Sequence, residues 1–215
     1  MSVPVSVIMP VRNEQRHLAD AVDAVLHQDY DGEIQVVLAV GPSQDDTQAV
    51  AADLAATDAR VTVVANPSGR TPDALNAAIA ACRHDIIARV DAHSELAPGY
   101  LTAAVAALQA TGAVNVGGVM AAVGQTPFTR AVAAAMRSPL GVGAASFHTG
   151  GTAGPADTVY LGVFQRSALD NVGGYDPHFS RAQDWELNYR LRAAGGLIWF
   201  DPSLVVTYRP RRSLR

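Results

Sequence analysis

Residues 5–28 read VSVIMPVRNEQRHLADAVDAVLHQ, and the hydrophobic period changes within this segment. The first five residues form a continuous apolar run, which is typical of a buried strand. From residue 14 to residue 28 the period becomes that of an amphipathic helix. Its apolar face consists of Leu18, Ala21, Val22, Val25 and Leu26. The segment therefore predicts a strand followed directly by a helix, the repeating unit of α/β proteins.

The same alternation continues to Asp91. It predicts strands at 34–40, 61–65 and 86–90, and helices at 45–56 and 71–82. Strands that alternate with helices indicate a parallel sheet with right-handed crossovers and helices on both faces. In the rest of the chain we predict helices at 99–110, 128–136 and 184–194, and strands at 113–123, 158–164, 197–200 and 204–208.

No linker interrupts these elements, so we expect a single α/β domain with a mostly parallel, Rossmann-like sheet over residues 1–215. A stretch rich in glycine, alanine, serine and threonine at 139–155 has no clear period and predicts a mobile loop. A loop of this length inside a compact domain is usually functional or disordered.

Composition excludes several classes of protein. The chain has 215 residues, 49% of them hydrophobic and 17% charged, which excludes disordered, collagen-like and coiled-coil chains. The net charge of −4 provides no basic surface for a duplex, so we expect no nucleic-acid partner. Cys82 is the only cysteine, which excludes an intramolecular disulfide and fits a reducing compartment.

The first residues lack the basic and apolar regions of a signal peptide, and the uncharged stretch 96–129 is broken by glycine, proline and polar residues. We therefore expect a soluble, cytoplasmic protein. The chain ends on a basic run formed by Arg209, Arg211, Arg212 and Arg215. This run fits peripheral contact with anionic lipid at the inner face of the plasma membrane, binding of a diphosphate, or a solvated terminus. A membrane-proximal tail beyond residue 215 is a further alternative.

In a parallel sheet, ligands bind beyond the carboxyl ends of the strands. The first predicted strand is followed by 10–14 (PVRNE). In one interpretation Arg12 and Glu14 contact a ligand. In the other, Asn13 and Glu14 cap the next helix. The third is followed by 66–70 (NPSGR). Asn76 is unfavourable in mid-helix, which favours a polar contact to a ligand or to a neighbouring loop.

Two further positions carry groups suited to catalysis. Asp91 and His93 follow the fourth predicted strand; in an extended segment they would point the same way and form half of a divalent-metal site. Asp184 opens a predicted helix, which suits either a cap or an ionised base. For Trp185 we expect a core position first and a sugar-stacking platform second.

Taken together, these motifs resemble family 2 glycosyltransferases with the GT-A fold. The likeness rests on 5–14 (VSVIMPVRNE), 66–69 with 74–76, 91–93 (DAH), 173–176 (GGYD) and 183–186 (QDWE), and it covers nearly the whole chain. Within that family the chain is most similar to glucosyltransferases of succinoglycan-type exopolysaccharide synthesis, on 91–93, 115–118 (NVGG), 157–160 (DTVY), 183–190 and 208–211 (YRPR).

The resemblance implies an inverting transfer of a sugar from a nucleotide-diphosphate donor, UDP-glucose or a similar UDP-hexose, to a saccharide or lipid-linked saccharide. It implies a nucleotide-binding half at about 1–93 and an acceptor-binding half at about 94–215, with Asp91 and His93 at the metal and Asp184 as the base. The implied donor-binding residues are Pro10, Arg12, Glu14, Asn66, Arg70, Asn76 and Asp91; the implied acceptor-side residues are Gly162, Trp185, Glu186 and Arg209. Arg12, Arg70 or Arg209 would assist at the diphosphate.

Two positions depart from the family pattern. Residues 39–43 read AVGPS where the family usually has Asp-Asp-Gly-Ser with an aspartate on the uracil, so the nucleotide is left open. His93 replaces the last aspartate of the metal signature, which favours Mn²⁺ over Mg²⁺. The alternatives are a polyprenyl-phosphate glycosyltransferase, a non-catalytic nucleotide-sugar-binding fragment of a longer transferase, and a nucleotidyltransferase, the last disfavoured because the chain has no lysine.

Overall fold

The computed structural model describes residues 2–124, 126–136, 138 and 146–208. Its first half consists of alternating strands and helices, as the sequence predicts. In chain order the elements are β1 (Val5–Val11), α1 (Leu18–Leu26), β2 (Ile34–Val40), α2 (Thr47–Thr57), β3 (Val61–Ala65), α3 (Thr71–Ala81) and β4 (Ile86–Arg89).

The second half is less regular. It contains β5 (Ser94–Leu96), α4 (Tyr100–Thr111), β6 (Asn115–Ala122), α5 (Pro127–Met136), α7 (Ser146–Thr149), β7 (Gly154–Pro155), β8 (Tyr160–Gln165), α8 (Arg166–Val172), α9 (Gln183–Ala193) and β9 (Ile198–Tyr208). Strand β5 and helix α8 are not indicated by the sequence pattern. The predicted loop 139–155 lies partly outside the described residues, and its described part contains α7 and β7.

Two predicted elements have different bounds in the structure. The helix predicted from residue 14 begins at Leu18, because residues 15–17 form a turn after Asn13, whose φ of 56° is left-handed. The two short strands predicted at 197–200 and 204–208 form one strand, β9, and its parallel pairing with β6 shifts register between Gly117 and Val119.

The described strands form one nine-stranded sheet in the order β3-β2-β1-β4-β8-β6-β9-β5, with β7 paired to β9. The first four neighbours, β3 to β4, pair in parallel, with Val5 opposite both Ile34 and Ile86. Strand β8 is antiparallel to β4 and β6, whereas β6 and β9 are parallel to each other. The carboxyl ends of β1, β2, β3, β4 and β6 therefore meet at one edge.

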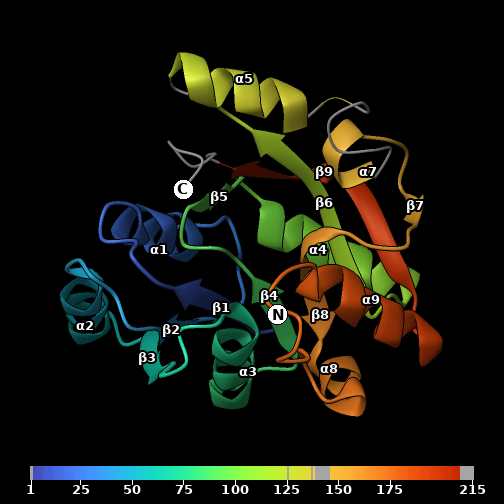
Figure 1. The fold of residues 1–215 in the computed structure, drawn as a ribbon. Coiled ribbons are helices and arrows are strands. Elements are labelled where there is room, and N and C mark those ends of the chain that lie inside the picture. The colour runs from blue at the N-terminus through green and yellow to red at the C-terminus, as the bar shows by residue number, and fades with distance from the viewer. Residues whose placement is uncertain (1, 125, 137, 139–145, 209–215) are drawn as a thin grey trace.

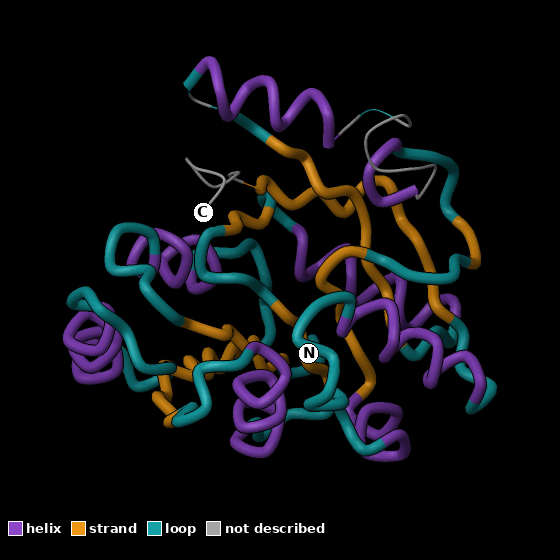
Figure 2. The backbone as a smooth tube through the Cα atoms, viewed as in Figure 1, coloured by secondary structure: helices purple, strands orange, loops and turns teal. Residues whose placement is uncertain are grey.

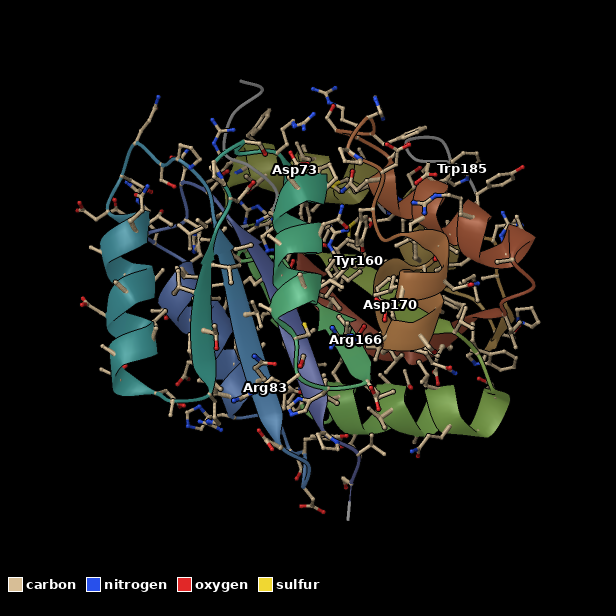
Figure 3. The ribbon with its side chains drawn as sticks, turned by 90° about the horizontal axis from the view of Figure 1, so that it is seen from below. Asp73, Arg83, Tyr160, Arg166, Asp170 and Trp185 are labelled. Carbon is tan, nitrogen blue, oxygen red and sulfur yellow. The ribbon has the colours of Figure 1, made fainter. Side chains whose placement is uncertain are left out.

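Helices cover both faces of the sheet (Figure 2). Along β1, Val5, Val7 and Met9 pack with α1, α2 and α4, whereas Ile8 packs on the opposite face with α3, α8 and α9. Figure 3 shows α3 and α8 on the near side of the sheet. Helix α5 lies past the carboxyl end of β6, apart from these layers (Figure 1). None of the helices in the described ranges is long and apolar enough to cross a membrane.

Gly118 allows the close contact between β6 and β9. A Cβ atom at this position would lie 1.9 Å from the Leu204 carbonyl oxygen and 2.5 Å from that of Asp201, so one strand would have to move. We expect Gly118→Ala to lower the free energy of unfolding by about 1–3 kcal/mol, the usual cost of overpacking. Urea denaturation measures this change.

Gly154→Ala is the matched control, because a Cβ atom there meets nothing within 4 Å. We expect its free energy of unfolding to stay within about 0.5 kcal/mol of the parent value. Equal destabilisation by the two substitutions would contradict the packing argument.

Candidate functional site

A cleft of about 1000 Å³ opens at the carboxyl edge, beside the ends of β1, β3 and β4. The sequence-predicted residues that line it are Pro10, Arg12, Glu14, Asn66, Asp91 and His93. Arg89, Tyr160, Gln183 and Tyr208 line it as well, together with residues of α5 and α7. The cleft therefore brings together groups from distant parts of the chain, as expected for the edge of a parallel sheet.

The loops after β1 and β2 are joined by hydrogen bonds. Arg12 donates from Nε to the Pro42 carbonyl (3.2 Å) and from Nη1 to the Gly69 carbonyl (3.3 Å). The Asn13 side chain accepts from the Gln44 backbone N–H (2.8 Å), and no side chain caps α1. The cap that the sequence allowed for Asn13 and Glu14 is thus not formed. Instead, these contacts hold the loops in one arrangement at the mouth of the cleft.

The loop after β3 is folded around Asn66, which is 4% exposed. Its side chain donates to the Arg70 carbonyl (3.2 Å) and accepts from the Ser68 hydroxyl (3.0 Å). Arg70 pairs with Asp73 (2.8 Å) and donates to the Pro177 carbonyl (3.3 Å), so its guanidinium joins this loop to the segment before α9. Arg70 is not among the residues that line the cleft.

Asp91 and His93 lie on a turn and not on the extended segment that the sequence predicted. Strand β4 ends at Arg89, and the Ser94 N–H donates to the Asp91 carbonyl (2.8 Å). Both side chains still line the cleft. The His93 Nδ1 lies 3.2 Å from the Glu14 carboxylate, and its ring packs edge-on against Tyr208 at 5.4 Å. The turn therefore presents one carboxylate and one imidazole beside the loop that follows β1.

The floor of the cleft is formed by Arg89, whose side chain is 4% exposed. Its Nε and Nη2 donate to Asp91 Oδ1 at 3.2 and 3.1 Å, and its Nη1 donates to Asp184 Oδ1. Burial by itself would lower the pKa of Arg89, but the Asp184 and Asp91 carboxylates hold that pKa well above its ordinary value. The guanidinium is therefore a permanent cation shared by two carboxylates.

Asp184 is the second residue of α9, where helix amides favour a negative charge. Burial raises the pKa of its carboxyl above the ordinary range, and the Arg89 guanidinium opposes this rise. Asp184 is not among the residues that line the cleft, whereas its neighbour Gln183 is. A partly exposed carboxylate paired with a buried cation is suited to accept a proton from a bound hydroxyl group.

Asn76 binds a neighbouring loop, one of the two uses that the sequence left open. Its amide donates to the Tyr175 carbonyl (2.7 Å) and accepts from the Tyr175 N–H (2.8 Å). The Tyr175 ring, 1% exposed, lies below Arg89 with 5.9 Å between the guanidinium carbon and the ring centroid. A Cβ atom at Gly174, whose φ is +71°, would lie 2.6 Å from Asn76 Oδ1, so this clamp requires glycine.

Among the predicted acceptor-side residues, Gly162 and Glu186 have structural contacts. Gly162 is buried in β8 with φ of +97°, close to Asn115 and Phe164. Glu186 pairs with Arg190 (2.5 and 2.7 Å), which also donates to the Val172 and Gly174 carbonyls and so joins α8 to α9. Neither residue lines the cleft.

The expected core position of Trp185 is wrong. Its side chain is 55% exposed and stacks on Tyr189, also 55% exposed, at 6.1 Å and 16°. Figure 3 shows Trp185 near the same edge as Asp73, where α3 and α9 begin. The predicted residue Arg209 lies outside the described residues.

The sequence analysis assigned no role to Arg89 or Tyr175. The signal for Arg89 was a charge next to the apolar run 86–88, because an arginine in a buried strand needs partners. Nothing local identified its partners, since Asp184 lies 95 positions along the chain. Tyr175 belonged to a quoted motif, 173–176, but its position under the guanidinium depends on the tertiary fold.

Comparisons with known proteins identify the family of the chain. The profile of Glycosyl transferase family 2 matches residues 6–173. The chain is 34% identical over 210 residues to the succinoglycan biosynthesis protein ExoA of Rhizobium meliloti (strain 1021). The match covers 97% of this chain and 64% of that protein, so the chain spans less than two thirds of the length of this relative.

Solved structures with a similar fold include two glycosyl-donor complexes. S. aureus TarS (residues 1–349) with UDP-GlcNAc has a TM-score of 0.75 at 15% identity, over 97% of this chain and 59% of that one. Mannosyltransferase PcManGT from Pyrobaculum calidifontis with GDP-Man and Mn²⁺ has a TM-score of 0.72 at 22% identity, over 97% and 58%. These likenesses confirm the predicted α/β fold class of the GT-A type.

Proposed function

Because the chain belongs to glycosyl transferase family 2, we propose that it transfers a hexose from a nucleotide-diphosphate sugar to a saccharide or lipid-linked saccharide, with inversion at the anomeric carbon. The proposed process is synthesis of an exopolysaccharide or another cell-envelope glycan, at the inner membrane face. The supporting observation is the meeting of Asp91 and Asp184 on one guanidinium at the floor of the cleft. Donor chemistry and acceptor chemistry need one carboxylate each, held at a fixed separation.

The donor contacts are proposed for Pro10, Arg12, Glu14 and Asn66, which line the cleft within the first half of the chain, residues 1–93. TarS is described with UDP-GlcNAc and PcManGT with GDP-Man, which supports a nucleotide-sugar donor. A UDP-hexose, in particular UDP-glucose, is the proposed donor. Residues 94–215 would then provide the acceptor side.

The turn 91–93 fits a divalent cation. Both contacts of Arg89 with Asp91 fall on Asp91 Oδ1, so Oδ2 takes no part in them, and the His93 ring would add a nitrogen ligand. No group of three metal-binding side chains occurs within the described ranges, so the donor diphosphate and water would complete the coordination. A carboxylate with an imidazole suits Mn²⁺ better than Mg²⁺. When bound, the cation would neutralise charge on the departing diphosphate.

Asp184 is the proposed base. The acceptor hydroxyl would transfer its proton to the Asp184 carboxylate as its oxygen forms a bond to the anomeric carbon. The bond from that carbon to the diphosphate oxygen breaks in the same step, and its electron pair leaves with the nucleotide diphosphate. A single displacement inverts the configuration, so an α-linked donor would give a β-glycoside.

The exposed pair Trp185–Tyr189 is the proposed acceptor platform. The two nearly parallel rings begin one residue after Asp184, and exposed aromatic faces of this kind bind the apolar face of a pyranose ring. The name of the relative ExoA refers to succinoglycan, which supports a saccharide as the acceptor.

Calorimetric titration tests the donor site. We expect UDP or GDP to bind with Mn²⁺, to bind more weakly with Mg²⁺ and to lose at least about tenfold in affinity with EDTA or in Asp91→Ala. Asp58→Ala, a surface carboxylate paired with Arg60, is the control and should bind as the parent does. If neither nucleotide bound under any condition, the site would be inactive and a non-catalytic fragment of a longer transferase would be the better description.

Asp184→Asn tests the base. We expect kcat for transfer to fall by about 10²–10⁴-fold, because the amide cannot accept the hydroxyl proton. Radiolabelled sugar transferred from the donor to an acceptor measures the rate. Near-parental transfer by Asp184→Asn would exclude this residue as the base.

Trp185→Ala tests the acceptor platform. We expect the affinity for oligosaccharides prepared from succinoglycan, measured calorimetrically with UDP and Mn²⁺ present, to fall by about fivefold or more through the loss of stacking. Phe128→Ala is the control, since Phe128 is also an exposed aromatic residue (40%) but lies on α5 and not on α9; neither Phe128 nor Trp185 is among the residues that line the cleft. Equal affinity in the parent and in Trp185→Ala would remove the platform from the acceptor side.

A further inference from the structure

Arg89 joins two carboxylates that belong to different parts of the proposed reaction. Asp91 lies on the donor side and Asp184 on the acceptor side, 95 positions from Arg89. Each carboxylate receives separate N–H groups of the same guanidinium: Nε and Nη2 for Asp91, Nη1 for Asp184. A change in the charge of either carboxylate therefore changes the field and the hydrogen bonds of the cation that holds the other.

The surroundings of Arg89 prevent it from turning away. Its side chain is 4% exposed, and the buried Tyr175 ring lies below it at 5.9 Å. Tyr175 is fixed in turn by two hydrogen bonds between its backbone and the Asn76 side chain: the Asn76 amide donates to the Tyr175 carbonyl and accepts from the Tyr175 N–H. The guanidinium can therefore redistribute its contacts between the two carboxylates while it stays in its buried position at the floor of the cleft.

We propose that Arg89 is a positioning residue that couples the donor side of the cleft to the base, so that the charge on Asp184 sets how strongly Asp91 holds a nucleotide with its cation. This inference rests on the proposed function. When Asp184 is uncharged, the guanidinium pairs with Asp91 alone and competes with the bound cation for that carboxylate. When the donor engages Asp91, the guanidinium pairs more fully with Asp184 and keeps the base ionised.

The bridge needs the geometry of arginine in addition to its charge. The planar fork of a guanidinium can serve two carboxylates at once, whereas the ammonium of lysine is a compact point charge. Arg89→Lys therefore keeps a buried cation beside the carboxylates but removes the two-armed bridge.

A double-mutant cycle tests the coupling. The dissociation constant of UDP with Mn²⁺, or of GDP if that nucleotide binds, is measured calorimetrically for the parent, Asp184→Asn, Arg89→Lys and the double variant. We expect Asp184→Asn to weaken binding by about fivefold in the parent but by less than about twofold beside Arg89→Lys. Thermal denaturation establishes that each variant is folded.

Arg166→Lys is the matched control background, because Arg166 is partly buried and pairs with the Asp170 carboxylate at the start of α8 (Figure 3), outside the cleft. Asp184→Asn should change the dissociation constant of the nucleotide by the same factor in the Arg166→Lys background as in the parent. If Arg89→Lys does not fold, Asn76→Ala is the second background; it releases Tyr175 without changing either carboxylate, and we expect it to reduce the coupling.

An equal effect of Asp184→Asn with and without the bridge would overturn the coupling while leaving the donor site intact. The absence of any effect of Asp184→Asn on nucleotide affinity in the parent would also overturn it. If neither nucleotide bound to the parent, the proposed function would fail and this inference with it.

Discussion

The buried ion pairs of Arg89 constrain the whole site. A guanidinium with 4% exposure has lost nearly all contact with water. The free-energy cost of this desolvation is large unless carboxylates and hydrogen bonds replace the solvent. Asp91 and Asp184 provide that replacement, so the ends of β4 and α9 must lie within reach of one side chain. The proximity of the two carboxylates to each other follows from this requirement.

Other parts of the structure keep the same pairing in place. The Asn76 amide nitrogen and oxygen both form hydrogen bonds with the backbone of Tyr175, and the Tyr175 ring packs against the Arg89 guanidinium. Arg190 ties the segment before Tyr175 to α9 through Glu186 and the Gly174 carbonyl. Helices α3, α8 and α9 thus share one polar framework beneath an otherwise apolar face of the sheet. Removing one partner of such a framework would leave buried groups unpaired.

Sequence reasoning identified the first half of the fold because its signals are local. The apolar runs 5–9, 34–40 and 61–65 each predict a strand that the structure contains. Strand β9 was predicted as two pieces, 197–200 and 204–208; in the structure the segment Asp201-Pro202-Ser203 between them is an irregularity within one strand. Helix α9 carries polar residues on several sides, so its sequence could not indicate whether the Trp185 side chain would be buried or exposed. The bridge through Arg89 was beyond sequence reasoning, since it joins positions 95 apart.

The loops at the mouth of the cleft show how a departure from a family motif can keep the shape of a site. Residues 39–43 (AVGPS) lack the aspartate that the family usually has after the second strand. The same loop is instead bound by Arg12 at the Pro42 carbonyl and through the Ser43 hydroxyl to the Asn13 N–H (3.1 Å). A backbone carbonyl and a neutral hydroxyl therefore hold this loop against the loop after β1 without that aspartate, and none of residues 39–43 lines the cleft itself.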